Sequence, residues 1–222
     1  MDIKRILSSC DHTLLSQDAT EKDIFALCDD AIKYGTASVC IPPCYVKSAK
    51  KYVDGRMKIC TVIGFPLGYQ KANVKAFETE EAVRDGADEI DMVINVGYLK
   101  SKRYDDISNE IKAVRAACEG KILKVIIETC LLTDDEKKIM CKIVGEAGAD
   151  YIKTSTGFSH GGATAEDIKI FSGNRPEGLK IKAAGGIKTL EDAELFLELG
   201  AERLGTSRIV KIVKSEDNIS GY

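Results

Sequence analysis

Two lysines occupy positions where an amine can do chemistry. Lys153 in "DYIKTSTG" and Lys182 in "IKAAGG" each end a short apolar run and precede small residues. A buried ammonium group is costly, so these side chains either extend back to water or are placed for a reaction. A second ammonium nearby and partial desolvation both favour a neutral amine, which attacks carbonyls and forms imines. The pair therefore favours Schiff-base chemistry over two solvated side chains.

An acid lies in a third apolar run. Asp91 is part of "DEIDMVI", where the alternation of a strand puts Glu89, Asp91 and Val93 on one face. A buried carboxylate must be paired or hydrogen-bonded. Asp91 is then either a proton shuttle beside the lysines or half of a structural ion pair, with Lys124 as its partner. The residues alone leave both interpretations open.

Two glycine-containing segments near the C-terminus are typical of phosphate binding. Gly185 and Gly186 follow one apolar run in "AAGGIKT", and Gly205, Thr206 and Ser207 follow the next in "LGTSR". Backbone N–H groups in such loops, together with a helix N-terminus, bind phosphate in many α/β barrels. Simple turn geometry explains either segment alone, but their occurrence on successive units favours a phosphate site.

A recurring phrase indicates the scaffold that positions these residues. A helical pattern ends in glycine, a small residue follows, and a short apolar run begins, as in "KYGTASVCI", "RDGADEIDMV", "EAGADYIKT" and "ELGAERLGT". Glycine after the last helical turn supplies a left-handed C-cap, after which the chain enters a strand. This is the helix-to-strand junction of a β-α-β unit. Its spacing is uneven, which argues against a solenoid repeat.

Eight short strands are predicted, each followed by a helical pattern. They cover Leu7–Asp11, Ala37–Ile41, Lys58–Ile63, Glu89–Val93, Leu123–Ile127, Tyr151–Lys153, Lys180–Ala183 and Arg203–Gly205. Eight such units without a break in composition favour an α/β fold, a (β/α)8 TIM barrel, in which catalytic residues lie at the carboxyl ends of the strands. An open doubly wound sheet is the alternative, but it usually has a glycine-rich turn after the first strand, and "DHTLLSQD" has no glycine.

The barrel is expected to form a single domain over residues 1–222. A short N-terminal helix precedes its first strand, and residues 215–222 are expected to be a mobile tail.

Composition excludes several classes of function. The net charge of −3 and pI near 5.6 provide no basic field for nucleic acid. No apolar run reaches the ~18 residues of a membrane span, and the N-terminus lacks a signal-peptide core, so a cytoplasmic protein is expected. The eight cysteines are scattered through apolar segments, which indicates reduced packing residues. With two histidines and no CxxC pair, a zinc site is not expected.

Several segments together resemble the deoxyribose-phosphate aldolase family. They are "GADEIDMVIN", "LKVIIETCLL", "DYIKTSTGF", "IKAAGGIKT" and "RLGTS", and "DHTLL" and "VIGFPLG" are similar to the early loops of that family. The resemblance runs from about Asp11 to Ser207. "KTSTGF" together with "KAAGGI" is its most specific part.

The resemblance implies a class I aldolase that needs neither metal nor cofactor. Such an enzyme reversibly cleaves 2-deoxy-D-ribose 5-phosphate to D-glyceraldehyde 3-phosphate and acetaldehyde, in the catabolism of deoxyribonucleotides and deoxyribose. By position, Lys153 forms the Schiff base, Lys182 perturbs it and joins in proton transfer, and Asp91 donates and accepts the proton. The residues implied in binding substrate and phosphate are Thr154, Gly185, Gly186, Gly205, Thr206 and Ser207. The implied accessory residues are Asp11, Lys124 and Tyr222.

One position departs from the pattern of some relatives, which have a basic residue directly after "KTSTG". Phe158 stands there, and Arg208 is the candidate to supply the missing charge. The final Tyr222 is similar to the last tyrosine of some relatives, where it assists proton transfer.

Two other functions remain open. One is a different phosphate-binding barrel enzyme, such as a transaldolase-like transferase or a sugar-phosphate isomerase, and the other is a non-catalytic sugar-phosphate binder. The expected partner is a small sugar phosphate, with neither nucleic acid nor membrane involved. The expected assembly is a homo-oligomer, either a dimer or a tetramer.

Overall fold

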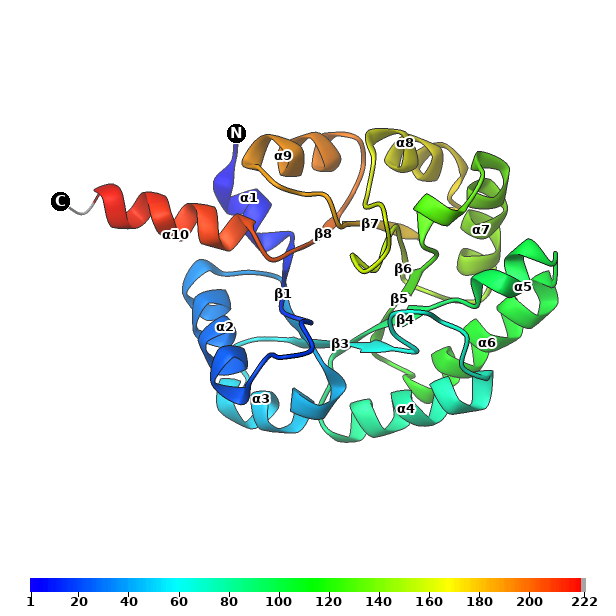
Figure 1. Cartoon of the computed structure of the whole chain (residues 1–222), viewed down its shortest axis with the longest axis horizontal. Coiled ribbons are helices and arrows are strands. Elements are labelled where there is room, and N and C mark those ends of the chain that lie inside the picture. The colour runs from blue at the N-terminus through cyan, green and yellow to red at the C-terminus, as the bar shows by residue number, and fades with distance from the viewer. Residues whose placement is uncertain (221–222) are drawn as a thin grey trace.

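The chain forms a closed barrel of parallel strands surrounded by helices (Figure 1). The computed structural model describes the backbone of residues 1–220 and the side chains of residues 1–215. Over this range each strand pairs with the next in sequence, and the last pairs with the first. The predicted TIM barrel is confirmed. The strands are β1 (Cys10–Thr13), β2 (Ser38–Ile41), β3 (Ile59–Ile63), β4 (Glu89–Val93), β5 (Ile122–Ile126), β6 (Tyr151–Lys153), β7 (Lys180–Ala184) and β8 (Arg203–Thr206).

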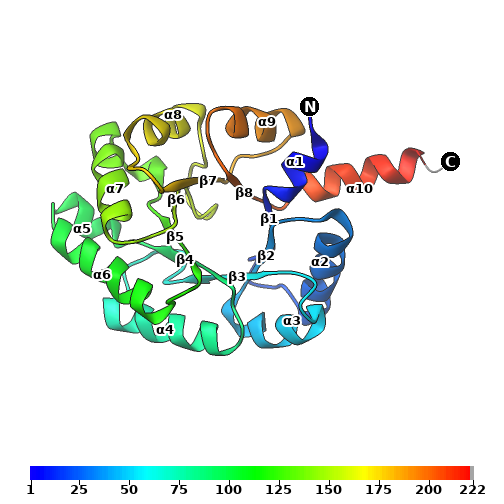
Figure 2. The same ribbon diagram turned by 180° about the vertical axis from the view of Figure 1, so that it is seen from behind.

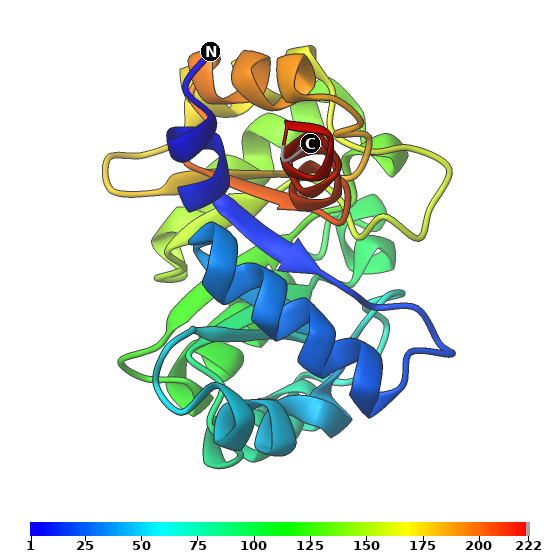
Figure 3. The ribbon, with the colours of Figure 1, turned by 90° about the vertical axis from the view of Figure 1, so that its left-hand side faces the viewer.

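Helices cover the outside of the barrel on all sides (Figures 1 and 2). The α-helices are α1 (Ile3–Ser8), α2 (Glu21–Tyr34), α3 (Val46–Val53), α4 (Ala72–Arg84), α5 (Val96–Lys100), α6 (Tyr104–Ala117), α7 (Asp134–Glu146), α8 (Ala165–Asn174), α9 (Leu190–Glu198) and α10 (Ile209–Ser220). Two short 3-10 helices, η1 (Pro43–Tyr45) and η2 (Thr129–Leu131), follow β2 and β5. The last helix, α10, contacts α2 and is seen nearly end-on in Figure 3.

The first strand begins later than predicted. Leu7 belongs to α1 rather than to a strand, and β1 starts at Cys10. The two apolar residues Ile6 and Leu7 are buried on this short helix, which contacts α9. A short apolar run is compatible with a buried helical turn as well as with a buried strand. Here the packing of α1 against α9 favours the helix.

Threonines begin four of the helices with reciprocal hydrogen bonds. In each capping box the threonine side chain accepts from the third helical N–H, and the acid at that position accepts from the threonine N–H. The pairs are Thr20 with Asp23, Thr133 with Glu136, Thr164 with Asp167, and Thr189 with Asp192. By contrast, α4 starts at Ala72 without a side-chain cap.

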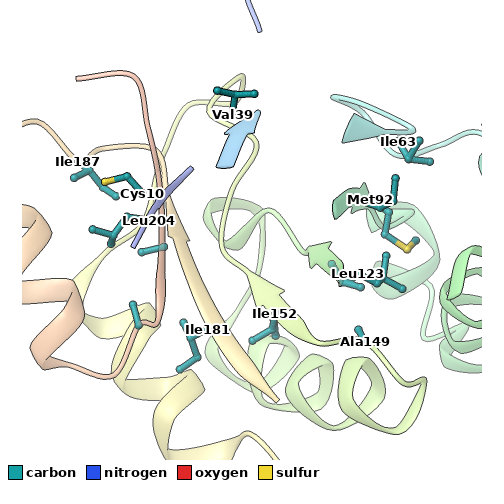
Figure 4. Close-up of a cluster of buried hydrophobic side chains, with 14 of the residues drawn as sticks. Cys10, Val39, Ile63, Met92, Leu123, Ala149, Ile152, Ile181, Ile187 and Leu204 are labelled. Carbon is teal, nitrogen blue, oxygen red and sulfur yellow. The ribbon is translucent and has the colours of Figure 1, made fainter. Parts of the chain in front are cut away.

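The main apolar core lies between the strands and the helices (Figure 4). Val39, Met92, Leu123, Ile152 and Ile181 alternate with inward-facing residues and are shielded from solvent. A second, small apolar cluster of Cys40, Cys60 and Val62 lies apart from it and packs against Leu15 and Phe65. Most of the remaining barrel interior is polar, which distinguishes this barrel from those filled by branched apolar side chains.

Within residues 1–220, no helix has the length and apolar character needed to span a membrane. The eight cysteines are all free, and six of them are buried, as expected for packing residues.

Candidate active site

The two lysines of the predicted site meet on neighbouring strands. Lys153 ends β6, Lys182 lies on β7, and their Cα atoms are register partners. Lys153 is 3% exposed and borders a cavity at the carboxyl ends of the strands, whereas Lys182 is fully buried beneath it. The barrel therefore places one amine within reach of a ligand and the other directly behind it.

Asp91 lies between the two lysines. Its Oδ2 accepts hydrogen bonds from Lys153 Nζ and Lys182 Nζ, each at 2.7 Å. Its Oδ1 accepts from Lys124 Nζ at 2.9 Å and from the Cys60 thiol at 3.2 Å. The proton-shuttle geometry and the structural ion pair with Lys124 thus coexist on opposite oxygens of one carboxylate.

Two further carboxylates, Asp11 and Glu89, form ion pairs with Lys182 and Lys124. Asp11 Oδ2 forms an ion pair with Lys182, and Asp11 Oδ1 accepts from Arg203 Nη1 at 2.6 Å and from the Ser38 hydroxyl at 2.7 Å. Glu89 lies 2.5 Å from Lys124 Nζ and 3.2 Å from Arg203 Nη1. Every member of this group faces the barrel interior because it follows the alternation of its strand.

The interior charges do not cancel. Among the described side chains, the four cations Lys124, Lys153, Lys182 and Arg203 face the three carboxylates Asp11, Glu89 and Asp91. If all seven are ionised, one positive charge is in excess in a region shielded from water. Of the three lysines in this group, Lys153 is the one that borders the cavity.

The cluster shifts the ionisation of its members. Burial alone would raise the pKa of Asp91, but the ammonium groups of Lys124, Lys153 and Lys182 lower it well below its ordinary value. Burial alone would lower the pKa of Lys182, but Asp11 and Asp91 raise it above its ordinary value. Lys182 therefore remains an ammonium at neutral pH, and Asp91 remains a carboxylate.

The cavity above Lys153 has a volume of about 570 Å³ and includes both predicted phosphate segments. Gly185 and Gly186 line it after β7, with φ angles of 74° and 78° that favour glycine. Gly205, Thr206 and Ser207 line it after β8. The structure thus brings all five glycine, threonine and serine residues of the two segments to the same cavity as Lys153.

Three cations border this part of the cavity. Lys188, Arg208 and Lys211 line it, and none of them forms an ion pair with a described side chain. They make this rim positive, as an anionic group requires. Phe158 also lines the cavity and is half exposed, with its ring packed edge-on against Phe65 at 5.1 Å between the ring centroids.

Thr154, which the resemblance implies in substrate binding, lies outside the cavity lining. Its hydroxyl accepts from Ala184 N at 3.0 Å and donates to Ala184 O at 3.1 Å, and the residue is fully buried outside the cavity lining. Because Lys153 faces inward, the next residue along the strand faces outward toward β7. Thr154 therefore ties β6 to β7.

Sequence reasoning assigned no role to Thr156 or to its partner Glu128. Thr156 lines the cavity, and the buried Glu128 accepts hydrogen bonds from both its backbone N–H and its hydroxyl. Thr156 lies only three residues beyond Lys153, so proximity was a usable signal for it. Glu128 lies at the end of another strand, and nothing near it in the sequence indicates its partner.

The accessory residues are found in different places. Asp11 and Lys124 lie in the charged cluster below the cavity. Tyr222 lies outside the described residues. His12 lines the cavity, and its buried Nδ1 has no hydrogen-bond partner among the described residues.

Two sets of potential metal ligands occur among the described side chains. They are Cys40, Cys60 and Asp91, and Asp11, Cys60 and Glu89. All three carboxylates already pair with lysine or arginine side chains inside the barrel. These ammonium and guanidinium groups occupy the positions that a cation would need.

Comparison with known proteins places this geometry among aldolases. The family model described as DeoC/LacD family aldolase matches residues 5–207, which include all eight strands. The chain is 56% identical over 215 residues to a protein named deoxyribose-phosphate aldolase from Clostridioides difficile (strain 630), covering 97% of this chain and 98% of that protein. It is also 56% identical over 216 residues to a protein of the same name from Streptococcus pyogenes serotype M4 (strain MGAS10750), covering 97% of each. A solved structure, described as the unique tetrameric structure of deoxyribose phosphate aldolase from Aeropyrum pernix, matches with a TM-score of 0.87 and 32% identity over 98% of this chain and 93% of that chain.

Proposed function

The chain belongs to the DeoC/LacD family of aldolases and is a lyase, and from this premise we propose that it is a Schiff-base deoxyribose-phosphate aldolase. Its reaction is the reversible cleavage of 2-deoxy-D-ribose 5-phosphate to D-glyceraldehyde 3-phosphate and acetaldehyde. The observation that carries the mechanism is the position of Lys153 Nζ, at the cavity floor and 2.7 Å from Asp91 Oδ2.

The reaction begins at the amine of Lys153. It adds to the aldehyde carbon C1 of the open-chain sugar, and water leaves to give a protonated imine. Removal of the 3-hydroxyl proton then breaks the C2–C3 bond, and the electron pair moves into the imine to form an enamine. Glyceraldehyde 3-phosphate departs, the enamine is protonated at C2, and hydrolysis releases acetaldehyde and the free lysine.

Asp91 and Lys182 handle the protons. The ionised Asp91 accepts the proton that Lys153 must lose before it attacks, and returns it when water leaves. Lys182, held as an ammonium by Asp11 and Asp91, keeps the carboxylate oriented and places a positive charge beside the amine of Lys153.

The phosphate is assigned to the positive rim of the cavity. The Gly185–Gly186 and Thr206–Ser207 segments line this region, and the second precedes the N-terminus of α10, so their backbone N–H groups are the proposed phosphate donors. Lys188 and Arg208 supply positive charge there, because Phe158 stands where some relatives have a basic residue. This assignment orients the aldehyde end of the sugar toward Lys153.

Reductive trapping tests the proposal. With acetaldehyde and borohydride, the peptide that contains Lys153 is expected to gain about 28 Da, the mass of an ethyl group replacing hydrogen. Lys153→Leu should lose both the adduct and aldol cleavage. Lys180→Leu is the matched control, because Lys180 is exposed at the start of β7, far along the strand from the cavity, and should keep both. An adduct on another lysine, or none, would overturn the assignment.

We also propose a homo-oligomer that acts in the cytoplasm on deoxyribose phosphates from nucleotide breakdown. The tetrameric relative from Aeropyrum pernix supports the first part of this proposal. Sedimentation of the purified protein tests it, with a single species at the monomer mass of 24.2 kDa as the contradicting result.

A further inference from the structure

Glu128 has an unusual backbone conformation next to the site. It lies two residues after the end of β5, it is 4% exposed, and its φ angle is 55°. A residue with a side chain rarely adopts this left-handed region, which costs about 1 kcal/mol or more. Such a cost persists only where surrounding contacts maintain it, so the contacts of Glu128 indicate what the conformation achieves.

The carboxylate of Glu128 binds one residue of the neighbouring loop twice. Its Oε1 accepts from Thr156 N at 3.1 Å, and its Oε2 accepts from the Thr156 hydroxyl at 2.5 Å. The backbone of the adjacent residue adds a third link, in which Thr129 N donates to Thr154 O at 2.9 Å. The loop after β5 therefore fixes the turn that follows Lys153.

These bonds determine the polarity of the Thr156 hydroxyl. A threonine hydroxyl has one proton and two lone pairs. The proton is directed to Glu128, and one lone pair accepts from Phe158 N at 3.0 Å. Only the second lone pair remains for a ligand, and Thr156 lines the cavity beside Lys153. Toward a ligand this hydroxyl can only accept a hydrogen bond.

We propose that Glu128 is a positioning residue that presents Thr156 as a fixed acceptor for a hydroxyl group of the three-carbon, phosphorylated part of the substrate. The inference rests on the proposed function and adds a determinant of specificity to it. Acetaldehyde carries no hydroxyl, so its reaction with Lys153 does not use this acceptor. Cleavage of the sugar phosphate and binding of glyceraldehyde 3-phosphate do.

Glu128→Gln is the decisive variant because it keeps the shape of the side chain. A glutamine has one acceptor oxygen, which can serve either the N–H or the hydroxyl of Thr156 but not both. If it serves the N–H, its amide donates to the threonine oxygen and the hydroxyl proton turns toward the cavity. We expect kcat/KM for 2-deoxy-D-ribose 5-phosphate to fall ~10- to 100-fold. Trapping of acetaldehyde on Lys153 should stay within about twofold of the unmodified protein.

Three further single variants and one double variant separate positioning from general support. Thr156→Val removes the hydroxyl but keeps the N–H bond to Glu128, and should match the loss seen in Glu128→Gln, while Thr156→Ser should retain activity. The losses of kcat/KM in Glu128→Gln and Thr156→Val should not add in the variant that carries both substitutions. Glu78→Gln is the matched control: Glu78 also accepts a strand-end N–H, from Gly64 at 2.8 Å, but it does not line the cavity. It should leave kcat/KM unchanged.

Calorimetry with glyceraldehyde 3-phosphate provides a readout that needs no Schiff base. A Kd raised ~10-fold in both Glu128→Gln and Thr156→Val supports the inference. Equal Kd values for these variants and the unmodified protein overturn it, as does an equal loss of trapping and cleavage in Glu128→Gln. Failure of the unmodified protein to form the Lys153 adduct instead overturns the proposed function, so the two failures are distinguishable. If Glu128→Gln does not fold by circular dichroism, Thr156→Val decides.

Discussion

The chemistry of single residues in this barrel depends on an excess of positive charge. Three lysines and Arg203 face three carboxylates in a region closed to solvent. Lys124 forms ion pairs with Glu89 and Asp91, and Lys182 forms ion pairs with Asp11 and Asp91. Among the described carboxylates, Lys153 pairs with Asp91 alone. The least compensated amine is therefore the one at the cavity, where a neutral nucleophile is needed.

Removal of Lys182 tests this reasoning. We predict that Lys182→Met moves the acid limb of the pH–rate profile for cleavage to higher pH by about one unit or more, because the remaining charges balance with Lys153 protonated. Turnover should fall ~10²- to 10⁴-fold as proton transfer is also lost. The measurement is kcat/KM from pH 5 to 9, with Lys180→Leu as control. An acid limb at the same pH in both variants would count against the role of the excess charge.

At the scale of elements, the site depends on the contact between two loops. The loop after β6 crosses the Gly185–Gly186 turn after β7 so closely that a Cβ on Gly162 would lie 2.5 Å from the Gly185 carbonyl carbon. Gly162 does not have a positive φ, so the restriction is steric and not conformational. The close approach of Gly162 to Gly185 thus sets the shape of the proposed phosphate segment.

Gly162→Ala should therefore disturb phosphate binding. We predict that the KM for 2-deoxy-D-ribose 5-phosphate rises ~10-fold or more, because displacement of a positioning loop is costly. Acetaldehyde trapping on Lys153 should change little. Gly173→Ala is the control, since Gly173 lies in α8 and a Cβ there meets no atom within 4 Å. Alanine should stabilise that helix by up to about 1 kcal/mol. Equal KM values in the two variants would show that the crossing is not critical.

At the scale of the whole molecule, buried His12 couples stability to pH. Burial lowers the pKa of His12 to about 4, with Asp30 raising it and Lys211 and Lys214 lowering it. The unfolded chain takes up this proton near pH 6.5 and the folded chain only near pH 4, so stability falls as pH decreases through this window. Below it, Asp11 and Asp91 extend the loss, because their lowered pKa values keep them charged after the unfolded carboxyls are protonated.

Urea unfolding at two pH values measures this coupling. We predict that the free energy of unfolding is about 2 kcal/mol lower at pH 5 than at pH 7.5 through His12 alone. His12→Gln should remove that part of the difference, because glutamine does not titrate. A pH dependence that is identical in the two proteins would show that His12 ionises as readily in the folded state as in the unfolded one.

The barrel and its central residues follow from local signals in the sequence. Glycine after a helix and a short apolar run before small residues place β4 and β6 at their observed bounds, Glu89–Val93 and Tyr151–Lys153. The same signals put Asp91, Lys153 and Lys182 on strands of one barrel, with Lys153 at the carboxyl end of β6. The physical reason is that C-caps, alternation and turn residues act within a few positions along the chain.

Tertiary structure decided everything that joins distant segments. Closure of β8 onto β1 brings Arg203 to Asp11, and the neighbouring loops bring Glu128 to Thr156. The tertiary structure also directs the Thr154 side chain to Ala184 of β7, although the resemblance implies a binding role for this residue. Sequence thus determined which residues have the chemistry for an aldolase. Only the closed barrel decided how their charges are compensated, because Coulomb and hydrogen-bond energies depend on separations in space and not along the chain.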